Sequence, residues 1–317
     1  MKLTKIGLTG LLMMSLVGCS TSTGTSTTTS PSASASTSTS DTTIHVYTRD
    51  SSSGTREAFE KGVGMESDQL TSSASEVSSN GDMATRVGAD TAGIGYTSLT
   101  TDFEANNIKA LNFEGVEASK ETVLDGSYKL QRPFNYALRA EYESEDLKQL
   151  VLAFIDYISL SQEGMAVISE NGGIVDDSNA KPWSEIAANY PVLNQDNSGL
   201  TIRTGGSTSV EHCIKAALES FAPLAGNVNF AMNQTGSSDA FKRTLGDEKD
   251  GPNAIDIGFA SRAFKDEETV SDGLGNGQFC LDAVVAVVNK ANALTNITAQ
   301  QLNQIYTGAI LSFADVQ

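Results

Sequence analysis

Short apolar stretches alternate with longer amphipathic stretches along most of the chain. The short stretches carry alternating or continuous apolar residues, which is the pattern of β-strands. Strands are expected at 44–47, 92–96, 108–113, 132–138, 200–203, 228–232, 254–260 and 281–288. The longer stretches place apolar residues three and four positions apart, which is typical of helices. Helices are expected at 56–61, 80–88, 144–160, 162–169, 210–221, 240–245 and 296–305.

This alternation predicts an α/β protein with a mainly parallel sheet, because each helix returns the chain to the same end of the sheet. The 317 residues allow one large or two medium domains and are ample for a sizeable core. One stretch interrupts the pattern. Residues 176–199 are polar, contain two prolines and are expected to be a connector.

The first 41 residues differ in composition from the rest of the chain. Two lysines precede an apolar run at 6–17, which is too short to span a bilayer and is typical of a secretory signal. Residues 1–18 therefore read as a signal peptide. Small residues directly before Cys19 resemble a bacterial lipobox, in which cleavage leaves a lipidated N-terminal cysteine; a plain signal peptide is the alternative. The Ser- and Thr-rich segment that completes 19–41 is expected to be a flexible tether that holds the body off the membrane.

Three junctions between an expected strand and an expected helix share glycine and consecutive hydroxyl residues. They are Arg49-Asp50-Ser51-Ser52-Ser53-Gly54-Thr55, Gly205-Gly206-Ser207-Thr208-Ser209 and Gly236-Ser237-Ser238. Free N–H groups at a helix start form a ready anion site, and an arginine beforehand offers a planar charged fork. One such junction is most simply an ordinary capped helix. Three of them predict that several helix N-termini converge on one small anion.

The motifs as a set resemble those of a known family. They are RDSSSGTREAFE, GGSTSVEH, NQTGSSDAF, AIDIGFASRAFKDEE, AGIGYTSL and LTNITAQQLNQIYTGAI. Together they resemble the phosphate-specific solute-binding protein of the high-affinity phosphate ABC importer, the PstS family, over residues 42–317. The resemblance implies a two-lobed fold of the periplasmic-binding-protein type (type II), with mixed, mostly parallel sheets and a ligand cleft between the lobes.

The order of the motifs departs from that of familiar members, in which the RDSxSGTR segment follows the TGAI segment. Here it comes first, which predicts a circular permutation with the cut just before the strand at 44. One lobe is then expected to contain 42–105 plus 285–317, and the other 106–284, with 176–199 joining the usual ends. The strand around Val46 should lie near the C-terminus, because the cut separates neighbours.

The resemblance also implies a ligand set for inorganic phosphate. The implied contacts are Arg49, Ser53, Gly54, Thr55, Thr208, Ser209, Ser237, Ser238 and Ser261, with Asp50, Arg56, Ser207 and Arg262 as further candidates. Ser261 stands where the best-known members carry an aspartate that accepts the proton of monohydrogen phosphate and repels sulfate. Asp50 is a candidate substitute for that acceptor, or else a partner of an arginine or a turn cap. Arg56 and Arg262 are open between direct contact and support.

The net charge limits the classes of binding partner, and the cysteine content limits the possible disulfides. The net charge of −18 argues against nucleic acid or anionic lipid as a partner. It does not forbid anion binding, because local N–H groups act within a few ångströms while surface charge is screened over about 8 Å. With Cys19 lipidated, Cys213 and Cys280 either pair or remain two buried thiols.

The sequence gives little support for a catalytic function. The two histidines, His45 and His212, lie in an expected strand and in the first turn of an expected helix, and no metal motif or nucleophile elbow is present. The expected protein is a non-enzymatic, monomeric lipoprotein without cofactor or metal. It would deliver phosphate to the membrane permease of an ABC importer, on a Gram-positive-type bacterial surface. Alternatives are a receptor for sulfate or molybdate, a surface adhesion or signalling protein, and a phosphatase.

Overall fold

The computed structural model describes residues 43–316. The predicted signal peptide, Cys19 and the whole Ser- and Thr-rich tether lie outside the described residues. Residues 43–316 belong to one compact unit. No helix in the described part of the chain is long and apolar enough to cross a membrane.

A single mixed sheet runs through this unit in the order β2-β1-β3-β10-β6-β9-β7-β8. The strands are β1 (His45–Arg49), β2 (Ser75–Val77), β3 (Gly93–Ser98), β4 (Ile108–Ala110), β6 (Gln131–Leu138), β7 (Thr201–Gly206), β8 (Asn229–Gln234), β9 (Ile257–Ala260) and β10 (Asn276–Asn289). Pairing is parallel at both ends of the sheet and antiparallel in the middle, where β10 pairs with β3 and β6. The expected α/β class is therefore right, with antiparallel crossing strands at the centre.

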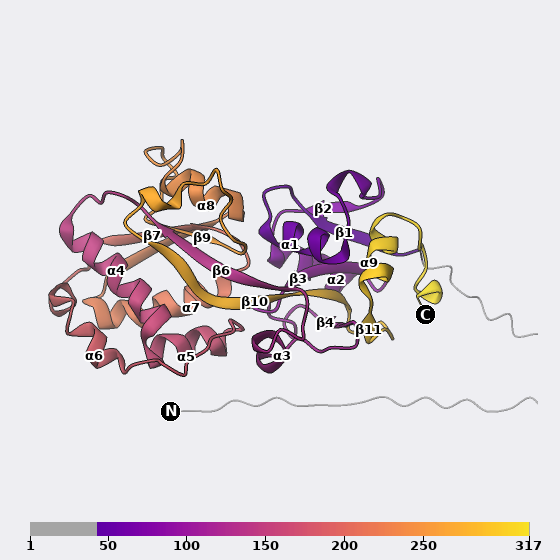
Figure 1. The fold of residues 1–317 in the computed structure, drawn as a ribbon, viewed down its shortest axis with the longest axis horizontal. Helices are drawn as coiled ribbons and strands as arrows, with labels where there is room; N and C mark the ends of the chain where they lie inside the picture. Colours follow the sequence, from indigo (N-terminus) through magenta and orange to yellow (C-terminus); the bar gives the residue numbers. More distant parts are fainter. Residues whose placement is uncertain (1–42, 317) are drawn as a thin grey trace, which may run out of the picture. The chain divides into compact units, whose positions relative to one another are not determined.

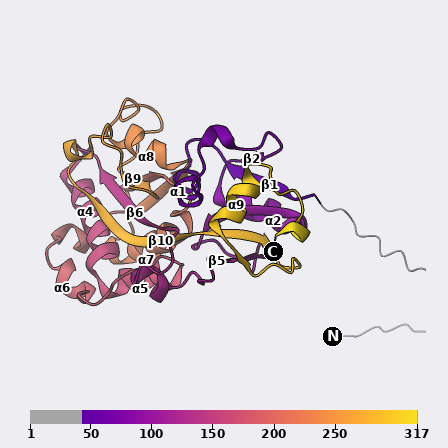
Figure 2. The ribbon, with the colours of Figure 1, turned by 45° about the vertical axis from the view of Figure 1, so that its right-hand side comes forward.

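Two hydrophobic clusters divide the unit into two lobes, joined by β6 and β10 (Figures 1 and 2). The first-lobe cluster contains Leu130, just before β6, and Ala283 on β10. The second-lobe cluster contains Phe134 on β6 and Cys280 on β10. Both strands therefore pass from one hydrophobic core to the other within three or four residues.

The boundary between the lobes differs from the one expected at residue 105. Ile108, Leu111, Val123 and Tyr128 belong to the first-lobe cluster. The reason is β4, which pairs with the C-terminal half of β10 and carries the following segment into the first lobe. In packing terms, the first lobe extends to about the start of β6.

Helices cover both faces of the first-lobe strands. They are α1 (Gly54–Val63), α2 (Asn80–Ala89), α3 (Lys120–Leu124) and α9 (Ala299–Tyr306). A Cβ on Gly95 would lie 2.4 Å from the Sδ of Met83 in α2, whereas the ring of Tyr96 stacks on Phe59 of α1 with centroids 4.0 Å apart. Successive strand residues point to opposite faces, so α1 and α2 lie on opposite sides of β3. Tyr306 of α9 completes an aromatic group with Phe59 and fixes α1 in place.

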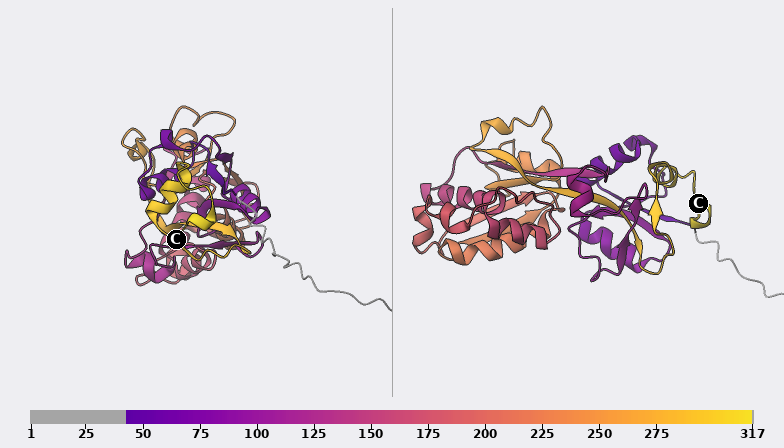
Figure 3. Two further views of the ribbon diagram at one scale, coloured as in Figure 1. Left: turned by 90° about the vertical axis from the view of Figure 1, so that its right-hand side faces the viewer. Right: turned by 60° about the horizontal axis from the view of Figure 1, so that its bottom comes forward.

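The helices of the second lobe are divided in the same way. They are α4 (Glu145–Leu160), α5 (Gln162–Glu170), α6 (Trp183–Ala187), α7 (Glu211–Phe221) and α8 (Ser237–Thr244). Figure 1 labels α8 above the strands of this lobe and α5, α6 and α7 below them, and Figure 3 gives two further views of the same ribbon. Ser144 caps α4 as its sequence pattern predicts, accepting from the N–H of Leu147 at 3.1 Å.

Several elements depart from the sequence-based expectation. The expected strand at 108–113 is two short strands, of which β5 (Asn112–Phe113) pairs with β11 (Asn296–Ile297) in a separate two-stranded sheet. The last helix consequently begins only after Thr298, which caps α9. The connector at 176–199 contains α6 and a 3-10 helix, η2 (Pro191–Asn194). Other 3-10 helices are η1 (Ser67–Gln69), η3 (Ala222–Ala225), η4 (Val270–Asp272) and η5 (Phe313–Asp315).

The start and the end of the described chain lie side by side (Figure 1). The N–H of Ile44 donates to the carbonyl of Leu311 at 2.7 Å, and Thr43 forms an antiparallel bridge with Ser312. This adjacency is the one that a circular permutation requires. The permutation itself stays a prediction.

Cys213 of α7 and Cys280 of β10 are both free and buried. Of the two alternatives for these residues, the structure has the pair of free thiols. Burial raises the pKa of each thiol, so little thiolate forms at neutral pH.

We therefore expect both thiols of residues 20–317 to be inert toward a thiol-specific dye in the native protein. The reason is that the dye requires both access and thiolate. Both should react fully once the protein is unfolded in guanidinium. A native protein in which one thiol reacts within minutes, or an unfolded non-reduced protein in which neither reacts, would contradict this expectation.

Candidate functional site

The first junction places Arg49 at the end of β1 and turns the chain into α1. Asp50 Oδ1 accepts from the N–H of Ser52 at 2.9 Å, which forms a tight turn. Ser53 then caps α1 by accepting from the N–H of Arg56 at 3.3 Å. Gly54 follows as the first helical residue. The positive end of the α1 dipole therefore lies directly beside the end of β1.

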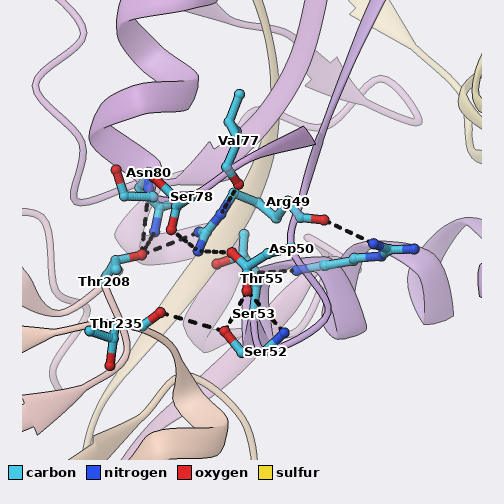
Figure 4. A network of polar contacts seen from close by, with 12 residues as sticks. Arg49, Asp50, Ser52, Ser53, Thr55, Val77, Ser78, Asn80, Thr208 and Thr235 are labelled. Atoms are coloured by element: carbon cyan, nitrogen blue, oxygen red, sulfur yellow. Dashed lines mark hydrogen bonds and ion pairs between the residues drawn. The ribbon is translucent and has the colours of Figure 1, made fainter. Parts of the chain in front are cut away.

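Arg49 is only 1% exposed and points into the molecule. Figure 4 shows its guanidinium reaching Thr208 of the other lobe, with an Nη1–Oγ1 distance of 3.2 Å. Its Nη2 donates to the carbonyl of Ser78 at 3.0 Å and to Asp50 Oδ2 at 3.1 Å. Burial lowers the pKa of Arg49, and Asp50 partly offsets that effect. The side chain is thus a buried cation, fixed on one edge and aimed across the lobe boundary.

The second and third junctions lie in the second lobe. Gly206 ends β7 at φ 100°, and a Cβ there would lie 2.2 Å from the carbonyl oxygen of Phe259, so only glycine fits. Ser207, Thr208 and Ser209 lead from it into α7. Ser207 Oγ accepts from the N–H of Ser209 at 3.1 Å and so shapes the turn. In the third junction Gly236 is the N-cap of α8 and Ser237 is its first residue.

The three junctions meet in one buried group of hydroxyls. We call Thr55, Thr208, Ser209, Ser237 and Ser261 the hydroxyl cluster. Thr55 and Ser209 are 2.9 Å apart across the lobe boundary, and Ser237 and Ser261 are 3.0 Å apart within the second lobe. A Cβ on Gly54 would lie 2.5 Å from Ser237 Oγ and 2.8 Å from Ser261 Oγ. The starts of α1, α7 and α8 therefore converge, as the motifs predicted.

Other residues of the predicted set are directed elsewhere. Ser238 reaches the carbonyl of Ser52 through both its N–H and its hydroxyl, at 3.3 Å. Arg56 donates to Glu60 at 2.7 Å and to the carbonyl of Arg49 at 3.0 Å. Arg262 forms a two-point ion pair with Glu268, at 2.7 and 2.8 Å, and also lies 3.2 Å from Glu57. These side chains hold the lobes and loops around the hydroxyl cluster.

Three residues that the motifs did not indicate join the cluster. Asn80, at the start of α2, donates from Nδ2 to Thr208 Oγ1 at 3.1 Å and to Ser209 Oγ at 2.9 Å. Its N–H also faces Thr208, at 3.4 Å, so α2 adds a fourth helix N-terminus. Arg132 of β6 reaches Ser209, and Asp282 of β10 holds Arg132.

The sequence did contain a signal for Arg132 and Asp282. Arg132 opens the apolar strand at 132–138, and Asp282 is the one charge in the apolar run at 281–288. Charged residues are almost never fully buried unless they are paired. An isolated charge of each sign, each in an apolar strand, is therefore the signature of a buried ion pair.

The cluster is rich in donors. Two arginines and both the side-chain amide and the N–H of Asn80 donate to it, while the acceptors within it are hydroxyl oxygens. The carboxylates beside it are already engaged: Asp50 by Arg49 and Ser52, and Asp282 by Arg132 and the 98–99 turn. No group of His, Cys, Asp and Glu in residues 43–316 could hold a metal ion. A small oxyanion supplies the acceptors that such a site lacks.

A recess reaches the cluster from the surface. It measures about 230 Å³, and its lining includes Asn80, Thr208 and Ser209 together with Glu211, His212 and Lys215. The cluster itself is buried, because each of its five members is at most 8% exposed. A ligand at the cluster would therefore be enclosed by both lobes.

Known proteins are similar to this chain in sequence and in fold. The model of the family described as PBP superfamily domain matches residues 27–162 and 191–315. Phosphate-binding protein PstS 2 of Streptococcus agalactiae is 32% identical over 282 residues, which cover 86% of this chain and 88% of that protein. The PstS 2 protein of Streptococcus pneumoniae is 29% identical over 282 residues, with 87% and 88% coverage.

A solved structure is similar as well. The crystal structure of a phosphate-binding protein of a phosphate ABC transporter from Streptococcus pneumoniae is 28% identical. It superposes with a TM-score of 0.62 and covers 87% of this chain and 100% of that one. The streptococcal sequences align over most of both chains, so they share the order of segments seen here. The chain belongs to the PBP superfamily and, within it, to the PstS family of phosphate-binding proteins.

Proposed function

We propose that the protein is an extracytoplasmic receptor that binds inorganic phosphate at the hydroxyl cluster and delivers it to the membrane permease of an ABC importer. The observation that carries the proposal is the convergence of four helix N-termini and Arg49 on one buried, donor-rich point between two lobes. Helix N–H groups and a guanidinium fork suit the oxygens of a tetrahedral anion. The PstS 2 relatives are named for binding phosphate, which supports the same ligand.

Binding and release complete this task without chemistry on the ligand. Solute-binding proteins of this family are not enzymes, and this chain is not one. The ligand favours a closed arrangement of the lobes only if both lobes contribute contacts to it. Arg49 and Thr55 contribute from the first lobe, and Thr208, Ser237 and Ser261 contribute from the second. The proposed ligand set is therefore split across the boundary that closure would seal.

Anchoring is a further part of the proposal. The lipobox-like residues before Cys19 and the Ser- and Thr-rich segment after it support a lipid-anchored protein that acts as a monomer on a Gram-positive-type surface. A mass measurement on protein from a membrane fraction would test this. The expected mass is that of residues 19–317 plus acyl chains, and an unmodified Cys19 would contradict the lipid anchor.

Calorimetric titration of residues 20–317 with phosphate, repeated in excess sulfate, tests the ligand. We expect binding of micromolar affinity or tighter, at least about 8 kcal/mol, that survives sulfate. Selectivity would then come from an acceptor other than the aspartate that Ser261 replaces. Asp50, the candidate substitute, pairs with Arg49 and closes the turn at Ser52, which is the other role considered for it. Equal competition by sulfate would instead make the protein a general oxyanion receptor. Failure to bind either anion would overturn the proposal and favour an adhesion or signalling role.

A further inference from the structure

Arg132 reaches the hydroxyl cluster from a different strand than Arg49 does. Its Nη2 donates to Ser209 Oγ at 2.9 Å, and its Nη1 donates to Ser261 Oγ at 3.1 Å. The side chain is buried at 4% exposure. Its guanidinium therefore presents both terminal nitrogens to two hydroxyls of the cluster, from the strand that crosses between the lobes.

The other edge of this guanidinium is fixed by Asp282. Nε and Nη2 donate to Asp282 Oδ2 at 2.8 and 2.7 Å. The second oxygen of Asp282 accepts from Ser98 Oγ at 2.8 Å and from the N–H of Leu99 at 3.2 Å. The carboxylate is fully buried, and both of its oxygens accept hydrogen bonds. It therefore holds Arg132 in one orientation, with the remaining donors directed at the cluster.

Two buried cations thus converge on neighbouring residues. Arg49 contacts Thr208 at 3.2 Å, and Arg132 contacts Ser209 at 2.9 Å. Each arginine has one carboxylate partner, Asp50 for Arg49 and Asp282 for Arg132, but the donors aimed at the cluster end on hydroxyls. Serine and threonine oxygens are neutral acceptors, whereas an anion would accept charge-assisted bonds, which are roughly twice as strong. A negative group between the two guanidiniums would therefore receive these donors in stronger bonds than the hydroxyls do.

Asn80 strengthens this argument. Ser209 Oγ already has three neighbours within 2.9 Å, namely Thr55, Asn80 and Arg132. A hydroxyl has one proton to donate and two lone pairs to accept with, so Ser209 is saturated. Thr208 Oγ1 faces three donors, namely Arg49 Nη1 at 3.2 Å and the Nδ2 and N–H of Asn80 at 3.1 and 3.4 Å, which is one more than its two lone pairs can accept. An oxyanion with several lone pairs on each oxygen relieves that excess.

We propose that Arg132 is a second phosphate-contacting arginine of this site and that Asp282 is the residue that positions it. The inference rests on the proposed function and adds to it. Phosphate is bound between Arg49 from the first lobe and Arg132 from a strand that joins the lobes. A phosphate ion bonded to both arginines would connect the first lobe to β6, the strand that runs between the lobes. Phosphate binding would therefore depend on how the two lobes are placed relative to each other.

Titration of residues 20–317 carrying Arg132→Gln tests the proposal. We expect phosphate affinity to fall by roughly a hundredfold, because a buried charged donor is lost. The matched control is Arg203→Gln, since Arg203 also pairs with a buried carboxylate, Asp256, at 2.9 Å but lies outside the cluster. This control should lower the melting temperature and leave phosphate affinity within about twofold of wild type.

Two further measurements keep the test decisive. Arg132→Lys retains the charge next to Asp282, so it should fold even where Arg132→Gln does not, and the loss of the fork should weaken binding by about tenfold. The affinity ratio of wild type to Arg132→Gln should also be larger above the pKa of inorganic phosphate than below it, because the dianion gains more from a second cation. A purely structural role for Arg132 would not change that ratio with pH.

Failure of this inference differs from failure of the proposed function. A wild-type protein that does not bind phosphate would remove the function. A wild type that binds, together with Arg132 variants that bind equally well, would overturn the role of Arg132 alone. Wild-type affinity in Arg132→Lys combined with a ratio that is constant with pH would likewise overturn it.

Discussion

Replacement of Arg49 by alanine is expected to raise the Kd for phosphate by roughly a thousandfold, which corresponds to about 4 kcal/mol. Arg49 is buried, its Nη1 reaches Thr208 across the lobe boundary, and it carries its charge beside the start of α1. Alanine removes the charge and leaves the hydroxyl cluster with one arginine fewer. Titration calorimetry would measure the loss directly.

The same substitution also removes contacts of the free protein, because Arg49 donates to the carbonyls of Val77 and Ser78. A matched control is Arg243→Ala. Arg243 is similarly buried and donates to the carbonyls of Asn253 and Asn233, at 2.7 and 2.9 Å. The control should lose stability but keep its affinity for phosphate. An Arg49→Ala protein that binds within about tenfold of wild type would show that Arg49 is not a ligand.

The motifs predicted the part of the site that depends on local chain geometry. Glycine and hydroxyl residues at a strand-to-helix junction determine a turn and a cap, and both are properties of a few neighbouring residues. The junctions that carry Arg49, Thr208 and Ser237 were identified in this way, and the structure brings them together. The roles of these residues as phosphate contacts came from the family resemblance and stay a prediction. The α/β class followed from the alternation of patterns for the same reason.

Long-range pairing could not be predicted in this way. Arg132 and Asp282 are 150 positions apart, and their contact depends on the antiparallel pairing of β6 with β10. The N-terminal part of β10, from Asn276, is polar and partly exposed, so its hydrophobic pattern gave no sign that the strand crosses between the lobes. Asn80 was recognised as the start of a helix. Its role at the cluster depends on where α2 lies against β3, which the sequence pattern does not specify.

The boundary between the lobes could not be predicted from the local sequence either. β4 is three residues long, and its pairing with β10 carries residues up to about 130 into the first lobe. Nothing in the local sequence of such a short strand selects its partner. A partition that relies on segment order therefore places this region in the wrong core, although each of its elements is locally plausible.

The second prediction concerns Gly54, which lies where the two lobes are in contact. Alanine at this position is expected to weaken phosphate binding by about ten- to a hundredfold, because overpacking of a tight contact costs about 1–3 kcal/mol. The added Cβ would lie 2.5 Å from Ser237 Oγ and 2.8 Å from Ser261 Oγ, both on the opposite lobe. The clash exists only while the lobes are in contact. The melting temperature of the free protein should therefore change less than that of the phosphate-bound protein.

Gly81→Ala is the matched control, because Gly81 also lies in the first turn of a helix beside the cluster. Its Cβ would meet nothing closer than Ser79 Oγ, at 3.7 Å, so affinity should stay at the wild-type value. Alanine is also the better helix former by roughly 1 kcal/mol, so both variants gain the same small helical term. The difference between them isolates the contact across the lobes. If Gly54→Ala binds phosphate as tightly as Gly81→Ala does, the close approach of α1 to α8 is not part of the bound state, and the ligand must be held with the lobes farther apart than they are here.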